Sequence, residues 1–344
     1  MKRLFVLITL LISFGLALAN MGVPYREGST HTAIYGNNHC TVTKEKINID
    51  IYNRGVDESR LYAVFRILYY INSDQNQDLP LLFIGKDLLE TKKIKVNQKT
   101  IATELLDSLS ILSYPFITQD HQSSIYHAQY TADDKIPVSL NELIYFNAPL
   151  HKGENTVYIE YEADLVFSVY GFLDNFQINY SLYPSRFWKS FGPIELALNL
   201  NNMAELTDSN LGKPIIQKGT AVWQIDHIDK DIALVINYKS NWFAKMLLYV
   251  GPEGIALLAS LIMFWLHFRW MHSSKRPNLV KWFGIFLVPL FTMIIYLLAY
   301  PLIDYVLDQQ SKHGYVFLIV LFYPLAVLCY LVLVSLANLI FRKK

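Results

Sequence analysis

Cysteine is nearly absent from this sequence, since its 344 residues include only Cys40 and Cys329. Cys329 lies in a long apolar run near the C-terminus, so it cannot pair with Cys40 inside one folded domain. A fold held together by a framework of disulfide bonds is therefore excluded. Residues 20 to 244 form a stretch that is long enough to bury an adequate apolar core without such bonds.

Charged residues are also scarce, at 17% of the chain, compared with roughly 25% in typical soluble domains. The deficit lies in residues 245 to 344, which have the composition of a membrane domain. Residues 20 to 244 carry 19 lysines and arginines against 26 aspartates and glutamates, a net charge of −7. Nucleic-acid binding needs a basic face that neutralises phosphates, so no nucleic-acid partner is predicted.

The short patterns that announce common chemistries are missing as well. The sequence contains no GxSxG, HExxH, CxxC or P-loop motif. These motifs place a nucleophile, a zinc site, a redox pair and a phosphate cradle, respectively. The sequence therefore names no reaction, and no cofactor is predicted.

The first twenty residues, MKRLFVLITLLISFGLALAN, have the pattern of a secretory signal peptide. Lys2 and Arg3 form a basic start, an apolar stretch follows, and Ala17-Leu18-Ala19 provides the small residues that precede a cleavage point. We predict cleavage after Ala19, so that residues 1–19 are the signal peptide. The alternative is an uncleaved membrane anchor.

Three further apolar segments are expected to cross a membrane as helices, at about 246–268, 282–303 and 314–341. The first segment qualifies if Pro252 and Glu253 lie at its outer end, because proline fits the first turn of a helix. Residues 245–344 are therefore predicted to be a membrane domain.

The loop between the first two segments is purely basic, whereas Asp304 and Asp308 outnumber Lys312 in the next loop. Positive residues are retained on the cytoplasmic side. This alternation predicts a protein of a bacterial-type cell (inner) membrane, with residues 20–244 on the periplasmic or extracellular side and a cytoplasmic C-terminus. The basic loop is interpreted first as a topology signal and second as a contact for anionic lipid headgroups. Its residues are Arg269, Lys275, Arg276 and Lys281.

Apolar and polar residues alternate along most of residues 40–244, which predicts half-buried strands. In the segment DNFQINYSLYP, residues 174–184, the apolar side chains share one face, and Gln177, Asn179 and Ser181 share the other. The segment 61–72 is apolar on both faces and is predicted to be a central strand. The residues predicted to lie in the core are Trp223, Ile225, Ile232, Leu234, Tyr180 and Ile178.

Many short alternating strands with few helices predict a mainly β fold. We expect an extracytoplasmic antiparallel β-sandwich of about ten strands over residues 20–244, followed by three C-terminal transmembrane helices. A helix is expected in this region only at residues 101–112. Two small sandwiches in tandem are the alternative, with the break at residues 132–137.

The loop after residue 182 is largely aromatic, although connecting loops normally favour polar residues. Aromatic side chains beside a cation are typical of binding hot spots, so the loop is a candidate site for a partner protein or a glycan. The competing interpretation, which we favour, is that the loop folds back and caps the sandwich. The candidate residues are Tyr183, Arg186, Phe187, Trp188 and Phe191.

Two smaller clusters are weaker candidates for a metal site. Clustered carboxylates suit a hard cation, but aspartate is also favoured in turns; this cluster comprises Asp226, Asp229 and Asp231. His121 and His127 have an even spacing that places both on one face of a strand, yet no acidic or cysteine cluster nearby completes a site. A solvated turn and a solvated face are the favoured interpretations.

These observations favour a membrane protein that presents a non-enzymatic binding or envelope-assembly module. Its expected partners are membrane lipids and either another envelope protein or a glycan. Two alternatives stay open: an extracytoplasmic hydrolase of glycan or peptide, and a sensor subunit that signals through a partner. The hydrolase needs a convergent catalytic set in a cleft. The sensor needs an output from another protein, because the largest predicted cytoplasmic segment is short.

Overall fold

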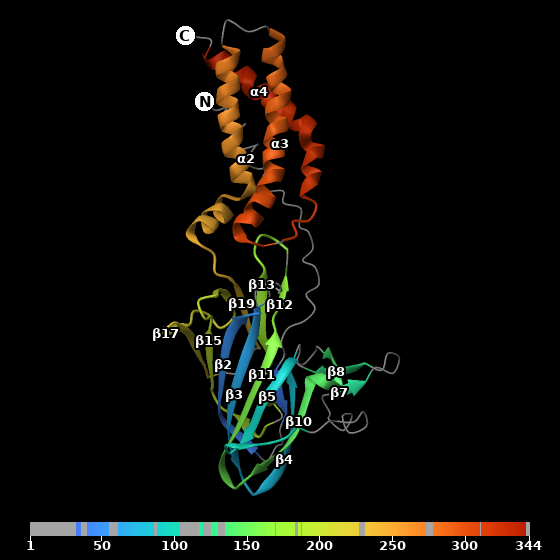
Figure 1. Cartoon of the computed structure of the whole chain (residues 1–344), viewed down its shortest axis with the longest axis vertical. Helices are drawn as coiled ribbons and strands as arrows, with labels where there is room; N and C mark the ends of the chain where they lie inside the picture. Colours follow the sequence, from blue (N-terminus) through green and yellow to red (C-terminus); the bar gives the residue numbers. More distant parts are fainter. Residues whose placement is uncertain are drawn as a thin grey trace.

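The computed structural model divides into a β-rich part, which ends at Tyr238, and a helical part that begins at Trp242 (Figure 1). We call these the β part and the helical part. The structure describes residues 32–35, 40–54, 61–85, 88–103, 117–119, 125–129, 135–168, 170–182, 185–186, 188–226, 231–272, 278–309 and 311–341. The predicted signal peptide, most of the predicted helix at 101–112, and residues 132–134 lie outside these ranges.

A nine-stranded sheet forms the centre of the β part. Its order is β17-β18-β15-β2-β3-β11-β5-β6, and β14 also pairs with β2. The strands are β2 (Cys40–Asn53), β3 (Leu61–Ser73), β5 (Leu88–Val96), β6 (Lys99–Thr100), β11 (Gly153–Asp164), β14 (Ser190–Phe191), β15 (Ile194–Asn199), β17 (Ile215–Gln217) and β18 (Thr220–Ile225).

Three smaller sheets accompany it. One has the order β1 (Thr32–Tyr35), β4 (Gln77–Gly85), β10 (Leu143–Leu150), and the short η2 turn (Leu140–Glu142) precedes β10. Another has the order β12 (Val166–Ser168), β13 (Asn175–Tyr180), β19 (Ile232–Tyr238), β16 (Ala204–Ser209). The last has the order β7 (Ile117–Gln119), β8 (Tyr126–Gln129), β9 (Lys135–Val138). The described residues thus contain more strands than the sequence predicted.

The large sheet is mixed, so the expectation of a wholly antiparallel fold is wrong for this sheet. Strand β2 runs parallel to both β14 and β15. A short hairpin loop forces its two strands to be antiparallel, but no such loop joins these elements, which lie far apart in the sequence. A close approach fixes the pairing, because a Cβ on Gly192 would lie 2.1 Å from the carbonyl oxygen of Thr43, at the bulge in β2.

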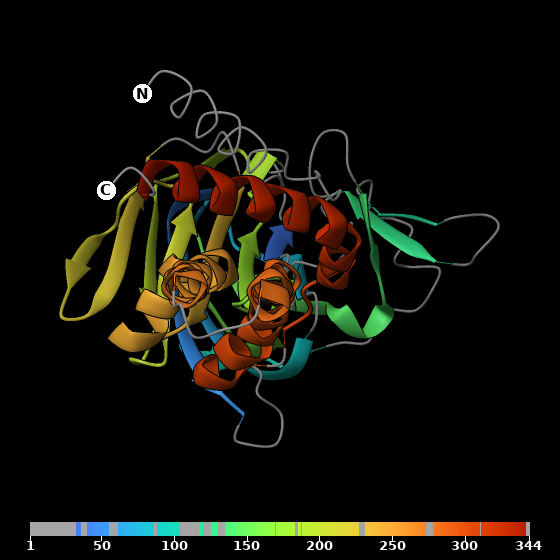
Figure 2. The ribbon, with the colours of Figure 1, turned by 90° about the horizontal axis from the view of Figure 1, so that it is seen from above.

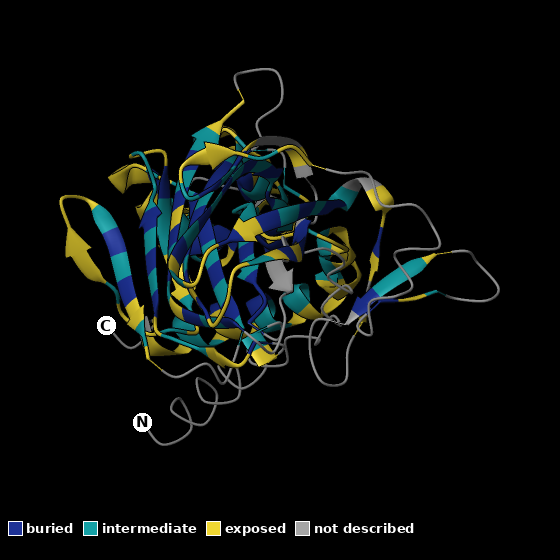
Figure 3. Cartoon of the chain, turned by 90° about the horizontal axis from the view of Figure 1, so that it is seen from below, coloured by how far each residue is buried: buried dark blue, intermediate teal, exposed yellow. Residues whose placement is uncertain are grey.

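One apolar core contains side chains from the large sheet and from the smaller sheets that include β4, β10, β13 and β19. Buried residues alternate with less buried ones along these strands (Figure 3). Five of the six predicted core residues are buried, and Ile225 is partly buried and packs against the core. Strands β3 and β11 precede and follow the proposed break at 132–137, yet they are neighbours in one sheet.

The prediction of a central strand at residues 61–72 is confirmed, because β3 lies between β2 and β11. The outward position predicted for Ser181 is wrong, since this residue is buried. Strand β13 ends at Tyr180, so the alternation stops there, and the Ser181 hydroxyl donates a hydrogen bond to Asp231 Oδ1 at 3.3 Å.

The helical part contains α2 (Trp242–Met271), α3 (Asn278–Leu307), the 3-10 segment η4 (Val316–Phe322) and α4 (Tyr323–Phe341). Three spans within it, 242–271, 282–307 and 316–340, are long and apolar enough to cross a membrane. The helices lie beyond one end of the β part, and α4 is inclined to α2 and α3 (Figures 1 and 2).

Helix α2 breaks near its start. Gly251 has φ 64° and ψ 175°, outside the helical region, and Pro252 therefore begins the longer segment. This arrangement fits the expectation that Pro252 occupies a first helical turn. Before the break, the Asn241 side chain caps the helix by accepting a hydrogen bond from the Ala244 amide at 2.8 Å.

Candidate functional site

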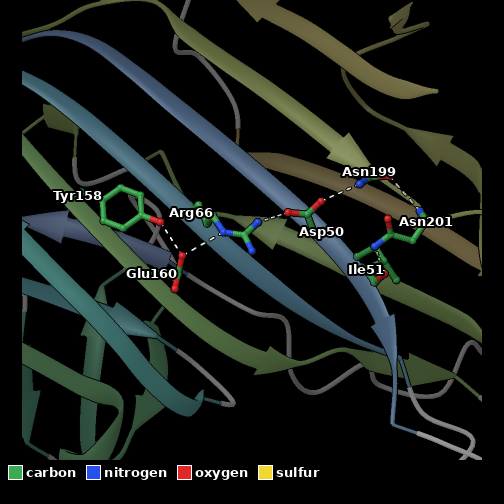
Figure 4. Close-up of polar contacts among 7 residues, drawn as sticks. All are labelled: Asp50, Ile51, Arg66, Tyr158, Glu160, Asn199 and Asn201. Atoms are coloured by element: carbon green, nitrogen blue, oxygen red, sulfur yellow. Dashed lines mark hydrogen bonds and ion pairs between the residues drawn. The ribbon is translucent and has the colours of Figure 1, made fainter. Parts of the chain in front are cut away.

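A row of paired polar side chains crosses the outer face of the large sheet (Figure 4). Alternation along β2, β3 and β11 turns their apolar residues into the core, which leaves Asp50, Arg66 and Glu160 on the opposite face. Arg66 bonds to Asp50 through Nη1 and to Glu160 Oε2 through Nε at 3.0 Å. Tyr158 donates to Glu160 Oε2 at 2.6 Å, and Asn199 donates to Asp50 Oδ1 at 2.8 Å. We call these five residues the polar row.

The charges of the polar row are mutually satisfied. Partial burial by itself lowers the pKa of Arg66, but the adjacent Asp50 carboxylate and further hydrogen bonds raise it above its ordinary value. Burial and the hydrogen bond to Glu160 raise the pKa of Tyr158 to about 12. Arg66 therefore stays charged and Tyr158 stays protonated at neutral pH. The hydrogen-bonded row forms a rigid polar surface, or floor, on the outer face of the sheet.

A groove of about 280 Å³ lies beside this floor. We call it the sheet-face groove; its lining residues are Leu68, Lys93, Lys95, Gln98, Thr156, Tyr158 and Glu160. The register of β5 and β11 places Lys93 opposite Glu160, and Lys95 opposite Tyr158. Among the residues that the structure describes, neither lysine has an ion-pair partner. The groove thus presents two cations, which no described carboxylate pairs with, beside hydroxyl and amide groups.

The β part and the helical part are joined at a second polar site, which we call the junction. It comprises residues 170–174, between β12 and β13, and residues 300–309 and 311–313, from the last turns of α3 onward. The Gly171 amide donates to the Lys312 carbonyl at 3.2 Å, and the Asp174 amide donates to Gln309 Oε1 at 3.1 Å. The Phe172 ring contacts both the His313 ring, at 4.6 Å between centroids, and the Tyr300 ring, at 5.4 Å.

Carboxylates at the junction are partly buried. Asp304 Oδ2 lies 2.7 Å from His313 Nε2. Asp304 Oδ1 and Asp174 Oδ1 are buried and have no hydrogen-bond partner among the described residues. Burial raises the pKa of Asp174 above its ordinary value. The linker between β19 and α2 is three residues long, and the Lys245–Glu205 pair at 2.6 Å adds another contact. The β part therefore contacts the helical part through several interactions in addition to the covalent linker.

A buried carboxyl lies inside the β core. Glu45 is 1% exposed; its Oε1 accepts a hydrogen bond from Tyr180, whose hydroxyl lies 2.8 Å from that of Tyr69. Its Oε2 has no hydrogen-bond partner among the described residues. Burial, opposed by hydrogen bonds from Tyr180 and Tyr69, raises the pKa of Glu45 from 4.5 to about 7.

The aromatic-loop candidates separate in the structure. Trp188 is 4% exposed and belongs to the apolar core, which is the position of a capping residue rather than of an exposed anchor. Phe191 is partly buried and packs against the same core, whereas Arg186 is exposed. Tyr183 and Phe187 lie outside the described residues.

The metal candidates are not brought together in the described residues. Asp226 is exposed, and Asp231 Oδ1 accepts a hydrogen bond from the Leu182 amide at 2.6 Å. His127 lies half-buried on β8, and Asp229 and His121 fall outside the described residues. Within the part of the chain that the structure describes, no three histidine, cysteine, aspartate or glutamate side chains are placed to hold an ion.

Of the four basic-loop residues, Arg269 is exposed near the end of α2, and Lys281 lies within α3. Lys275 and Arg276 lie outside the described residues.

Sequence reasoning overlooked the sheet-face groove and Glu45, although both leave a trace in the sequence. In the segment KIKV, Ile94 and Val96 share the buried face, so Lys93 and Lys95 must share the outer one. Glu45, Ile47 and Ile49 occupy alternate positions of one strand, so their side chains share a face. Because the two isoleucines face the core, the sequence also places Glu45 on the inward face. Such a residue is unusual enough to be sought directly.

No protein-family model matches this sequence, and a search of curated proteins finds no match. Among solved structures, a Legionella pneumophila protein with a provisional description as a nutrient binding protein aligns over 76% of this chain and 84% of its own, at 12% identity and a TM-score of 0.45. The M1 zinc metallopeptidase of Deinococcus radiodurans aligns over 59% and 43%, at 6% identity and a TM-score of 0.29.

Leukotriene A4 hydrolase from Saccharomyces cerevisiae aligns over 57% of this chain and 29% of its own, at 8% identity and a TM-score of 0.32. This chain thus spans less than half the length of either enzyme. At TM-scores this low, none of the three similarities carries an argument about fold or function.

Proposed function

We propose that this chain is an integral membrane protein that presents its β part outside the cytoplasm as a non-enzymatic binding module, with the sheet-face groove as its site for an acidic glycan. One observation carries the proposal: Lys93 and Lys95 have no ion-pair partner among the described residues, on a region with an excess of negative charge. An anionic group can pair with both lysines, while Gln98, Thr156 and Tyr158 suit the hydroxyls of a sugar.

The polar row favours binding over hydrolysis at this groove. A glycosidase needs one carboxyl that donates a proton and another that acts as a base or nucleophile. In the polar row, Asp50 and Glu160 both accept hydrogen bonds from Arg66, and Tyr158 also donates to Glu160. Both carboxylates are engaged as hydrogen-bond acceptors within the row, so neither is placed to donate a proton to a glycosidic oxygen.

Removing either lysine should weaken binding of oligogalacturonate, a model acidic glycan, to the purified full chain. Each of Lys93→Ala and Lys95→Ala is expected to reduce affinity about tenfold, because a hydrogen bond to a charged group contributes about 1.5–3 kcal/mol. Calorimetry supplies the measurement, with the methyl-esterified oligosaccharide as the uncharged counterpart.

The chain offers a matched control for these two variants. Lys44 and Lys46 have the same spacing on the same sheet, but Glu195 pairs with them at 2.7 and 3.9 Å. Lys44→Ala and Lys46→Ala should leave the affinity unchanged. Equal losses in all four variants, or equal binding of the methyl ester, would contradict a specific acidic-glycan site.

A sensor subunit is the second candidate, and the junction favours it. Phe172 contacts both Tyr300 and His313. A shift of the turn between β12 and β13 would therefore change the packing at the end of α3. The same binding experiment distinguishes the two functions when amide hydrogen exchange is followed at residues 304–313. Protection that changes on ligand addition supports a sensor, and unchanged protection supports a binding module alone.

The proposed orientation has its own test. A reporter fused after Lys239 should be active when it is alkaline phosphatase, which works only after export, and inactive when it is a cytoplasmic fluorescent protein. The expectation follows from the basic loop after α2 and the slightly acidic loop after α3. Fluorescence without phosphatase activity would place the β part inside the cell and overturn the orientation.

A further inference from the structure

A groove of about 560 Å³ lies between α2 and α3. It belongs to the half of the helical part that is farthest from the β part, where α2 ends and α3 begins (Figure 1). Its walls are mostly apolar and include Leu266, Leu287 and Phe291. The polar or charged side chains in its lining are His267, Arg269 and Trp270. We call it the α2–α3 groove. Its volume falls in the range of roughly 300–1,000 Å³ that is usual for small-molecule sites.

The shape of this groove is fixed by a contact across three helices. His267 on α2 is 4% exposed, and its Nδ1 lies 2.8 Å from the hydroxyl of Tyr330 on α4. Gly284 on α3 lies directly against the ring, since a Cβ there would be 2.3 Å from His267 Nε2. Because the ring is held between two neighbouring helices, it cannot rotate to close the groove.

The charge at the mouth of the groove is not balanced by any carboxylate among the described residues. Arg269 is exposed, its guanidinium lies 5.6 Å from the centroid of the Trp265 ring, and it has no ion-pair partner among the described residues. Lys275, Arg276 and Lys281 follow in the sequence, and no aspartate or glutamate occurs between Glu253 and Asp304. Arg269 is therefore available to an anion from outside the chain.

We propose that the α2–α3 groove binds one acyl chain of an anionic phospholipid, whose phosphate lies against Arg269. The apolar walls suit the hydrocarbon chain, which gains contacts that a smooth helix surface does not offer. Arginine suits the phosphate because its planar guanidinium donates two parallel hydrogen bonds to it. The site thus selects for headgroup charge at one end and for a hydrocarbon chain along its length.

The test uses the purified full chain in phosphatidylcholine nanodiscs that contain a small fraction of a photoreactive lipid, with the reactive group in an acyl chain. Phosphatidylglycerol and phosphatidylcholine probes are compared, and the labelled residues are mapped by peptide mass spectrometry. We expect the phosphatidylglycerol probe to label Leu266, Leu287 or Phe291 about fivefold more than the phosphatidylcholine probe, since one surface cation contributes ~1 kcal/mol to anionic-lipid binding.

Two variants, each with a control, test the headgroup end and the acyl-chain end of the site separately. Arg269→Ala should remove the preference for phosphatidylglycerol, and Lys245→Ala, at the other end of α2 and paired with Glu205, should retain it. Leu266→Trp should fill the groove and reduce labelling with both probes, whereas Leu261→Trp, an exposed position on α2 outside the lining, should not. Equal labelling of the native chain by both probes, or the same response to Arg269→Ala and Lys245→Ala, overturns the proposal.

Discussion

Replacing Trp188 with alanine is expected to destabilise the β part by about 3–5 kcal/mol, as is usual when a large buried aromatic residue is removed. Trp188 is 4% exposed and packs in the same core as Ile178 and Leu234. The surrounding strands are fixed by their pairing, so the cavity cannot fully collapse. A domain of this size should lose roughly 2–4 °C in melting temperature for each kcal/mol.

The measurement is thermal unfolding of the β part within the purified full chain. Amide hydrogen exchange in β2 and β14 is the readout. These strands report directly, because the segment after Trp188 pairs with β2 and the Lys189 amide donates to the Cys40 carbonyl at 3.1 Å. Arg186→Ala is the control from the same loop; because Arg186 is exposed, its loss should cost less than about 1 kcal/mol. An unchanged melting temperature for Trp188→Ala would contradict the capping role and favour the interpretation that this residue docks a partner.

Strand phases were predictable because each strand carries its own periodicity. The residues of β13 illustrate this, since Phe176, Ile178 and Tyr180 are all buried as their alternation indicates. The apolar character of segment 61–72 likewise identified the central strand β3. Local pattern therefore reports correctly on which face of a strand is buried.

Relations between distant segments were not predictable from such patterns. The parallel pairing of β2 with β15 depends on Gly192 fitting against Thr43, and periodicity carries no information about that contact. The sheet-face groove combines β5 with β11, and the junction combines Phe172 with His313. Each site arises from the pairing of segments that lie far apart in the sequence, and the periodicity of one sequence does not specify that pairing.

The titration of Glu45 should make the β part less stable as the pH rises. The folded-state pKa is about 7, raised from the ordinary value of 4.5. Between these two values the folded state holds a proton that the unfolded state has released, so stability falls across this window. Below about pH 4.5 both states are protonated, and above about pH 7 the loss levels off at about 3 kcal/mol.

Glu45→Gln removes this titration and still offers an oxygen to the Tyr180 hydroxyl. Relative to the native chain, the variant should therefore gain about 3 kcal/mol in unfolding free energy between pH 4.5 and pH 8. A glutamine amide at the position of Oε2 also lacks a partner among the described residues, which lowers the stability of the variant by the same amount at every pH. The quantity to compare is therefore the change in unfolding free energy with pH, rather than its absolute value. Unfolding of the full chain by denaturant at several pH values, read from hydrogen exchange in β2 and β3, provides the measurement.

Glu195→Gln is a control in which the sign is reversed. The hydrogen bond from Lys44 lowers the pKa of Glu195, so this carboxylate stabilises the folded state above its unfolded pKa and loses that effect as the pH falls. Because Glu195 is part-exposed, the effect should be small, within about 1 kcal/mol. Between pH 4.5 and pH 8 the stability of Glu195→Gln relative to the native chain should stay flat, and it should change only below about pH 4.5, because the pKa of Glu195 is lowered from 4.5. A rising difference for Glu45→Gln beside a flat one for Glu195→Gln would locate the pH dependence in the buried carboxyl. A flat difference for Glu45→Gln over the same range would mean that water reaches Glu45 and that its carboxylate is ionised in the core at ordinary pH.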